Sequence, residues 1–441
     1  MKKRIFSCVL SAILVMGLAS CGSDDEGSSS GSASKSNDSN GSTEPTTITY
    51  YTWETSEQTN PVWQEIEDEL NIKVEVCVLP DTGGTDKESA LDIVAMSGSE
   101  MDFRIITSSQ AATRVEKGFA LELTDLIEKY DVDMEDLFGK YGEFVQFNGA
   151  YYGIPCRGNL NYWFYNKNIF DELNLDYPQD GWTWDEYYAL ADKITQESDY
   201  FGTCTNAHSG MWYNNGLEQG GQFFDANGKF NFLNDEKLIN SMENYYRMDQ
   251  EGVKPSFVSM RSRNSYVSTE FLSGNCAMAE GWPYILRDMR LPDQFPFDFE
   301  VGVVTPPVNS KGDPSVSLIN VEFLAVNPAS EHPEEAFLAM TYYMEHGAKY
   351  VAGLTLPPTT KVDDELIEAF VEGTPISKED GAKFFDESVE LVAMNPWGNY
   401  ENGQEYQAIV NEEAEVYFTG GQDLDTTLSN IDKRAKELEE S

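Results

Sequence analysis

The most constraining feature of the sequence is a regular alternation of strand-like and helix-like segments that begins near residue 48. Residues 48–53 and 72–79 are rich in β-forming residues, and residues 103–107 form a third short apolar run. Two stretches with one apolar face, 61–70 and 87–96, separate these runs. Strands that alternate with helices at this spacing pair in parallel, because the crossover helices must cover the faces of the sheet. The pattern therefore predicts an α/β lobe.

The rest of the chain continues the alternation, with more helix and more aromatic residues. The sequence predicts strands over 301–305 and 317–326 and helices over 184–195 (with Thr183 as N-cap), 238–250, 333–345 and 424–438. A length of 441 residues exceeds one ordinary hydrophobic core. We therefore expect two lobes plus tails.

The N-terminal segment has the features of an export signal. A basic start, Lys2-Lys3-Arg4, precedes an apolar run over residues 5–17 that is too short to span a bilayer as a mature helix. The following Leu18-Ala-Ser-Cys21 resembles the lipobox of bacterial lipoproteins. This resemblance implies a signal peptide over residues 1–20 and a lipidated Cys21. Residues 21–45 are almost entirely small and polar, which predicts a flexible tether that holds the body at the outer face of the cell membrane.

The charge of the chain excludes several classes of partner. There are 76 acidic residues against 30 basic ones, which gives a formal net charge of −46. Such a field repels nucleic acid and anionic lipid surfaces. We therefore expect no nucleic-acid partner, contact with a membrane only through the lipid anchor, and a monomeric, soluble body.

Cysteine and histidine are too sparse and too widely spaced for a structural zinc site. The chain has three His and no CxxC pair, so we expect neither a metal nor a cofactor. From residue 46 on, the chain has no GxSxG, P-loop or HExxH motif, which argues against an enzyme. The four Cys of the body could be thiols or form up to two disulfides: Cys77, Cys156, Cys204 and Cys276.

Several segments, taken in order, resemble the solute-binding proteins of ABC importers of the maltose-binding type. The segments are Thr47–Trp53, Ala95–Gly98 with Gly118–Asp125, Gly149–Pro155, Trp163–Lys167, Trp182–Glu186, and Phe271–Met278 with Gly281-Trp282. One departure is Met101-Asp102, where the family has Pro-Asp. The resemblance implies a periplasmic-binding-protein-like fold of type II, with two α/β lobes joined by a crossing hinge around a ligand cleft. It also implies permease subunits as partners.

The same resemblance places the boundaries of the lobes. The N-terminal lobe would comprise residues 46–157 and 300–345, and the C-terminal lobe residues 158–299 and 346–441. Arg157 and Asn159 would then lie at the crossing, where the resemblance implies polar contacts to the ligand. A solvated hinge position is the alternative for both residues.

The ends of the predicted strands supply further candidate ligand contacts. An open α/β sheet binds its ligand beyond the carboxyl ends of its strands. Trp53 and Glu54 follow the first strand, and Ser108 and Ser109 follow the third. Core packing for Trp53 and loop solvation for the two serines are the alternatives.

Aromatic and amide side chains occur together in three places, and this combination favours a carbohydrate ligand. Aromatic rings stack on the C–H faces of sugars, and amides and carboxylates pair with the hydroxyl groups. Core packing is the alternative for each tryptophan. A peptide or other polar solute, or a surface glycoside-active enzyme, is the alternative function. The candidates are Trp212, Tyr213, Asn214, Trp282, where the resemblance implies a stacking ring, and Trp397.

Overall fold

The computed structural model describes residues 44–79, 87–207 and 210–440. The predicted signal peptide, Cys21 and nearly all of the tether lie outside these residues. The chain separates into a unit over residues 1–44 and a unit over residues 45–441. Every helix and strand of the described residues belongs to the second unit.

A mixed sheet forms the centre of the first half of the fold. Its spatial order is β11 (Glu390–Ala393), β10 (Val316–Val326), β3 (Phe103–Thr107), β1 (Thr46–Thr52) and β2 (Ile72–Val78), and β6 (Ile154–Leu160) also pairs with β10. β1 pairs in parallel with both β2 and β3, which confirms the pairing predicted from the alternation. β10 runs antiparallel to β3 and β6 and parallel to β11.

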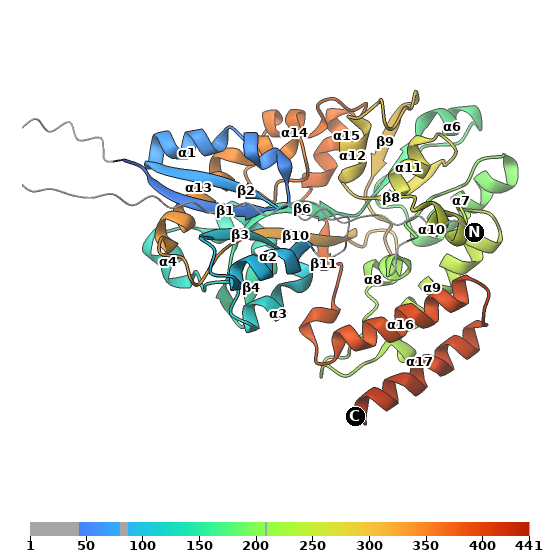
Figure 1. The fold of residues 1–441 in the computed structure, drawn as a ribbon. Coiled ribbons are helices and arrows are strands. Elements are labelled where there is room, and N and C mark those ends of the chain that lie inside the picture. Colours follow the sequence, from blue (N-terminus) through green and yellow to red (C-terminus); the bar gives the residue numbers. More distant parts are fainter. Residues whose placement is uncertain (1–43, 80–86, 208–209, 441) are drawn as a thin grey trace, which may run out of the picture. The chain divides into compact units, whose positions relative to one another are not determined.

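Helices cover both faces of this sheet (Figure 1). α1 (Val62–Leu70) and α13 (Pro333–Ala352) pack together on one face, and α2 (Lys87–Met96) and α3 (Ala111–Glu116) lie on the other. α13 continues past the predicted end at residue 345. A Cβ atom added at Gly347 would lie 3.0 Å from Cγ2 of Val62, so this glycine allows α13 to approach α1 closely inside the helix.

A second, three-stranded sheet is antiparallel throughout. Its order is β8 (Met278–Gly281), β7 (Tyr162–Asn166) and β9 (Val301–Val304). Trp163 on β7 is fully buried and makes edge contacts with Trp182, Trp184 and Tyr187. The last two belong to α7 (Trp184–Glu197), which Thr183 caps as predicted, through a reciprocal bond with Glu186.

The chain passes from the first sheet to the second at Asn161, between β6 and β7. This crossing comes shortly after the predicted lobe boundary at residue 157, and α13 runs without a break through the boundary predicted at 345. The assignment of the two lobes to residue ranges stays a prediction.

A third group of helices packs around an aromatic core. It contains α8 (Asn214–Glu218), α9 (Glu236–Gln250), α16 (Gly403–Phe418) and α17 (Leu424–Glu439). A turn at Asn227-Gly228 lies beside this core, where Phe224 and Phe230 form a bridge across Gly228.

The remaining elements are short. The other helices and strands are α4 (Thr124–Lys129), α5 (Met134–Phe138), β4 (Gln146–Phe147), β5 (Ala150–Tyr151), α6 (Lys167–Glu172), α10 (Phe257–Arg263), α11 (Val267–Leu272), α12 (Tyr284–Met289), α14 (Asp364–Val371) and α15 (Lys378–Ala382). Across residues 44–79, 87–207 and 210–440, no helix combines the length and apolar character needed to cross a bilayer. Cys77, Cys156, Cys204 and Cys276 are free thiols, and the last three are buried.

Candidate functional site

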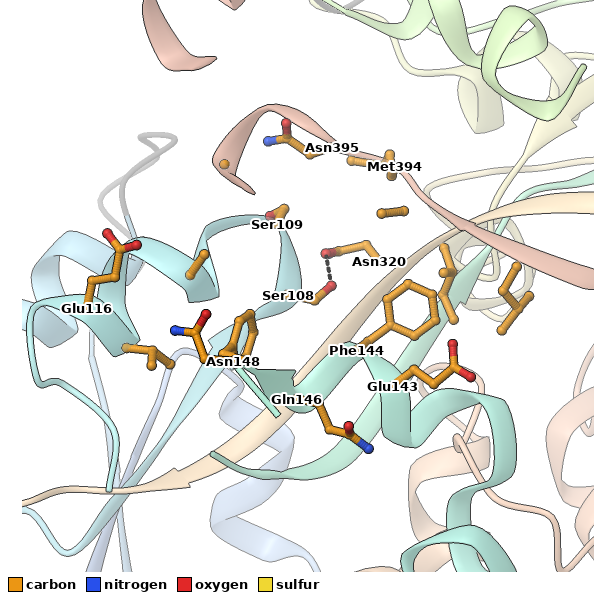
Figure 2. A pocket seen from close by; sticks show the side chains of 17 residues that line it. Ser108, Ser109, Glu116, Glu143, Phe144, Gln146, Asn148, Asn320, Met394 and Asn395 are labelled. Atoms are coloured by element: carbon orange, nitrogen blue, oxygen red, sulfur yellow. Dashed lines mark hydrogen bonds between the residues drawn. The ribbon is translucent and has the colours of Figure 1, made fainter. Parts of the chain in front are cut away.

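A cavity of about 550 Å³ opens at the carboxyl end of β3 (Figure 2). Its walls come from five places in the chain: the turn after β3 with α3, the segment leading into β4, the turn after β4, β10, and β11 with the turn that follows it. The lining residues are Ser108, Ser109, Ala112, Val115, Glu116, Glu143, Phe144, Gln146, Phe147, Asn148, Ile319, Asn320, Leu391, Ala393, Met394, Asn395 and Gly398.

Ser108 and Asn320 join the turn after β3 to the middle of β10. The Ser108 hydroxyl donates to Oδ1 of Asn320 at 3.3 Å and accepts the backbone N–H of Val321 at 3.0 Å. These bonds fix the Ser108 side chain and leave the amide nitrogen of Asn320 available as a donor, because it is Oδ1 that Ser108 engages. The structure therefore places the predicted contact Ser108, together with Ser109, in the cavity wall.

Asn159 lies directly opposite Asn320 on the neighbouring strand β6. Residues that face each other across an antiparallel pair share one face of the sheet. Asn159 is half-buried, and its Oδ1 accepts from the hydroxyl of Thr355 at 3.4 Å. Thus Asn159 adjoins the cavity-lining strand on the same face as Asn320, although it is not itself a lining residue.

The cavity combines hydrogen-bonding side chains with two aromatic rings. Hydroxyl and amide groups come from Ser108, Ser109, Gln146, Asn148, Asn320 and Asn395, and the rings from Phe144 and Phe147. Among the described residues that line it, the charged side chains are the carboxylates of Glu116 and Glu143. Such a lining can pair with hydroxyl groups and cover C–H surface, and it offers an anion no countercharge.

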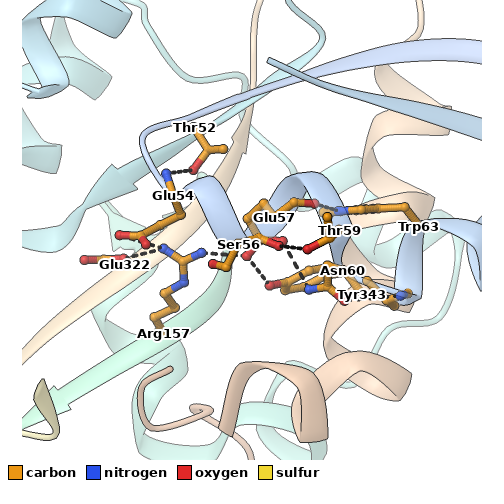
Figure 3. A network of polar contacts seen from close by, with 11 residues as sticks. Thr52, Glu54, Ser56, Glu57, Thr59, Asn60, Trp63, Arg157, Glu322 and Tyr343 are labelled. Atoms are coloured by element: carbon orange, nitrogen blue, oxygen red, sulfur yellow. Dashed lines mark hydrogen bonds and ion pairs between the residues drawn. The ribbon is translucent and has the colours of Figure 1, made fainter. Parts of the chain in front are cut away.

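Arg157 is held in a network of carboxylates beside this region (Figure 3). Its guanidinium lies 2.6 Å from Oε1 of Glu57, 3.3 Å from Oε2 of Glu322 and 3.7 Å from Oε1 of Glu54. Glu57 is only 1% exposed and also accepts the hydroxyl of Tyr343 at 2.8 Å. Arg157 thereby connects β6, β10, α13 and the helical turn after β1.

The electrostatics of this network keep the arginine charged. Burial by itself would lower the pKa of Arg157, but the carboxylates of Glu322 and Glu57 outweigh burial and hold that pKa well above its ordinary value. Burial raises the pKa of Glu322, and the neighbouring guanidinium opposes this rise. Because both terminal nitrogens of Arg157 are engaged by protein carboxylates, its position indicates a structural tie. Glu54 is half-buried and makes the longest of these contacts, and the half-buried Trp53 packs against the hydrophobic core.

The predicted aromatic contacts lie mostly in the hydrophobic core around α8, α9 and α16. Trp397 has no exposed surface, and its ring centroid lies 4.0 Å from that of Phe223. Its indole N–H donates to the hydroxyl of Tyr213 at 3.3 Å. Trp212 is buried against Phe232 and Phe418. The structure therefore brings Trp212, Tyr213 and Trp397 together with one another, and none of them lines the cavity.

Trp282 and Asn214 are also buried. Trp282 directly follows β8 and belongs to the same hydrophobic core as Trp397. Asn214 donates its amide N–H to Oε1 of Glu280 on β8 at 3.1 Å. As ligand contacts, both residues stay predictions.

Sequence reasoning missed Asn320 and the segment Glu143–Asn148. A signal for Asn320 was present: it and Glu322 are polar residues at alternate positions in a mostly apolar strand, and alternate residues share one face. Phe144, Gln146 and Asn148 gave a weaker signal, since a short run of this kind also occurs in ordinary turns. Asn395 and Gly398, which lie close to Trp397 in the sequence, line the cavity, whereas the ring of Trp397 does not.

The fold is shared with sugar-binding components of bacterial transporters. An ABC substrate-binding protein from Listeria monocytogenes in complex with cycloalternan has a TM-score of 0.72 at 21% identity, over 89% of this chain and 99% of that one. Maltose-bound MalE3 of T. maritima has a TM-score of 0.69 at 18% identity, over 89% of this chain and 100% of that one. The sugar-binding protein MalE of Xanthomonas citri has a TM-score of 0.70 at 19% identity, over 89% of this chain and 97% of that one. A search of curated proteins gives no match.

These likenesses confirm the predicted periplasmic-binding-protein-like fold of type II. Residues 53–350 also match the profile described as "bacterial extracellular solute-binding protein". Because this match covers more than half of the chain, the protein belongs to the family of bacterial extracellular solute-binding proteins.

Proposed function

We propose that this protein captures a carbohydrate, an oligosaccharide by preference, and delivers it to the permease of an ABC importer. The observation that carries the proposal is the cavity at the end of β3, whose hydroxyl and amide side chains surround the rings of Phe144 and Phe147. Its volume of about 550 Å³ lies within the range of roughly 300–1,000 Å³ that is typical of small-molecule sites. The complexes of similar structures with cycloalternan and with maltose support the same class of solute.

The solute is expected to be uncharged. Glu116 and Glu143 are the charged side chains among the described lining residues, and a buried anion without a countercharge would lose its solvation. We further propose that the protein performs no chemistry on the solute, that it acts as a monomer, and that Cys21 carries the lipid that holds it at the outer face of the membrane. The body would consist of the two predicted lobes, which close on the solute about the crossing at Asn161.

A thermal-shift screen of neutral mono- to tetrasaccharides, peptides and amino acids tests the proposal. A solute present at 100 times its dissociation constant stabilises the folded state by about 2.7 kcal/mol. We expect stabilisation by one or more saccharides and none by the peptides. Chromatography of the recovered saccharide should show it unchanged. Stabilisation only by a peptide or an amino acid would refute the carbohydrate assignment, and new reducing ends would refute the absence of chemistry.

A further inference from the structure

Two buried carboxyl groups lie next to each other at the crossing between the sheets. Glu218 is on α8 and Glu280 is on β8, and their side chains are 2% and 5% exposed. The amide nitrogen of Asn161, the residue that joins β6 to β7, donates to both: to Oε1 of Glu218 at 3.0 Å and to Oε1 of Glu280 at 3.2 Å. One side-chain nitrogen therefore holds two carboxyl oxygens.

The remaining contacts of the pair are neutral donors. The backbone N–H of Leu318 on β10 donates to Oε1 of Glu218 at 3.2 Å, and Asn214 donates to Oε1 of Glu280 at 3.1 Å. Neither carboxyl forms an ion pair within the part of the chain that the structure describes, and Oε2 of Glu218 has no hydrogen-bond partner there. Two ionised carboxylates in this position would be two buried negative charges without a cation, which is strongly unfavourable.

We propose that Glu218 and Glu280 hold a proton between them at neutral pH and that this proton stabilises the crossing segment. The pair connects three elements of the fold through Asn161, which also donates its backbone N–H to the carbonyl of Leu318 at 3.0 Å. With one carboxyl protonated, the site carries one negative charge that the amide donors of Asn161 and Asn214 can satisfy. When that proton is lost, both carboxyl groups are negatively charged and repel each other. No additional hydrogen-bond donor compensates the second charge, so the folded state is destabilised.

The electrostatics of the site agree with this geometry. Burial, reinforced by the charge of Glu280, raises the pKa of Glu218 well above its ordinary value. Burial also raises the pKa of Glu280, to about 7, against the hydrogen bonds from Asn214 and Asn161. Since the groups interact, the proton belongs to the pair and not to either residue.

The titratable groups that face the pair do not change charge near neutral pH. Burial raises the pKa of each neighbouring tyrosine and of the neighbouring thiol, so all of them stay protonated, and Arg247 is held by Asp192 and Glu251. These groups are Tyr187 and Tyr188 on α7, Tyr245 and Arg247 on α9, Tyr284 on α12, and Cys204.

The raised pKa of Glu280 determines the direction in which the stability of the fold changes with pH. The folded state binds the proton more tightly than the unfolded chain, in which a Glu has a pKa of about 4.3. The stabilisation is therefore fully present below about pH 4 and is lost as the pH rises through about 7, the folded-state value. Between these two values the unfolding equilibrium constant rises up to about tenfold per pH unit, and above about pH 7 it no longer depends on this proton.

Equilibrium urea denaturation of the full chain between pH 4.5 and 7.5 tests the proposal. Glu280→Gln keeps the shape of the side chain and removes its ionisation, so we expect the tenfold-per-unit dependence of the wild-type protein to become flat. The exposed Glu69→Gln is the matched control and should keep the wild-type slope. Equal slopes for Glu280→Gln and the wild-type protein would overturn the proposal.

A second measurement covers the case in which Glu280→Gln does not fold. Carbon-13 NMR of the wild-type protein, labelled at the glutamate carboxyl carbons, should show two resonances that titrate together above pH 6. Their absence would overturn the proposal. Calcium chloride should not alter the slope; if it abolishes the pH dependence, the pair binds a cation in place of a proton, and the proposal fails.

Discussion

Replacing Arg157 by methionine should destabilise the fold strongly. The change removes the guanidinium and keeps much of the aliphatic stem, so its main effect is on the three carboxylates that the guanidinium contacts. The largest effect is on the Glu57 carboxylate, which is 1% exposed and lies 2.6 Å from the guanidinium that is removed. Removing one partner of a buried ion pair costs about 3–5 kcal/mol of unfolding free energy, since the other charge stays buried.

A double-mutant cycle separates this effect from a simple loss of packing. In the Arg157→Met background, Glu57→Gln removes the stranded charge and should recover most of the lost stability. Urea denaturation at pH 7 gives all four free energies. Lys436→Met, which breaks an exposed pair with Asp432, serves as the control and should leave stability nearly unchanged. The reasoning is refuted if Arg157→Met costs less than about 1 kcal/mol, or if Glu57→Gln deepens the loss.

Three further predictions concern the cavity, the aromatic core and the anchor. Trp397→Ala should lower the free energy of unfolding by about 3–5 kcal/mol, because the ring is fully buried. Calorimetry should show that the variant binds the solute found in the screen with wild-type affinity. Reduced affinity at unchanged stability would place the ring in the site. Asn320→Ala should weaken binding about 5- to 10-fold through the loss of one hydrogen bond to the solute worth about 1 kcal/mol, and should lower stability by no more than about 1 kcal/mol through the loss of the bond from Ser108. Equal affinity would exclude Asn320 from the site. Cys21→Ala should move the protein from the membrane fraction to the soluble fraction, and retention on membranes after a high-salt wash would contradict the lipid anchor.

Much of the fold could be predicted because local patterns and tertiary structure agree. The segment with residues 48–107 contains strands and helices whose periodicity matches their burial, and α2 and β3 have the predicted bounds. The extent of α13 could not be predicted, because Gly347 is tolerated through a close contact with Val62, which lies far away in the sequence. The position of the crossing was likewise set by long-range pairing of β6 with β10.

The candidate site was harder to predict than the fold. Ser108 was predicted because it follows a strand end, and it lines the cavity because strand ends meet at one edge of a sheet. The positions of Trp212 and Trp397 in the hydrophobic core could not be predicted, because an aromatic ring beside amides suits a sugar site and a hydrophobic core equally well. The carboxylate partners of Arg157, Glu57 and Glu322, lie 100 and 165 residues away along the chain, and no local pattern reveals such pairings. As a ligand contact, Arg157 stays a prediction.

The position of β10 has a consequence for the order in which the chain can fold. This strand lies between β3 and its other partners, and Ser108 meets Asn320 across 212 residues of sequence. Ribosomes release a chain from its N-terminus, and contacts between distant residues form late because they require closure of a long loop. The first sheet therefore stays incomplete until β11 has been made, when about nine tenths of the protein has been synthesised. Until β10 has been made, β3 and β6 lack the strand that joins them.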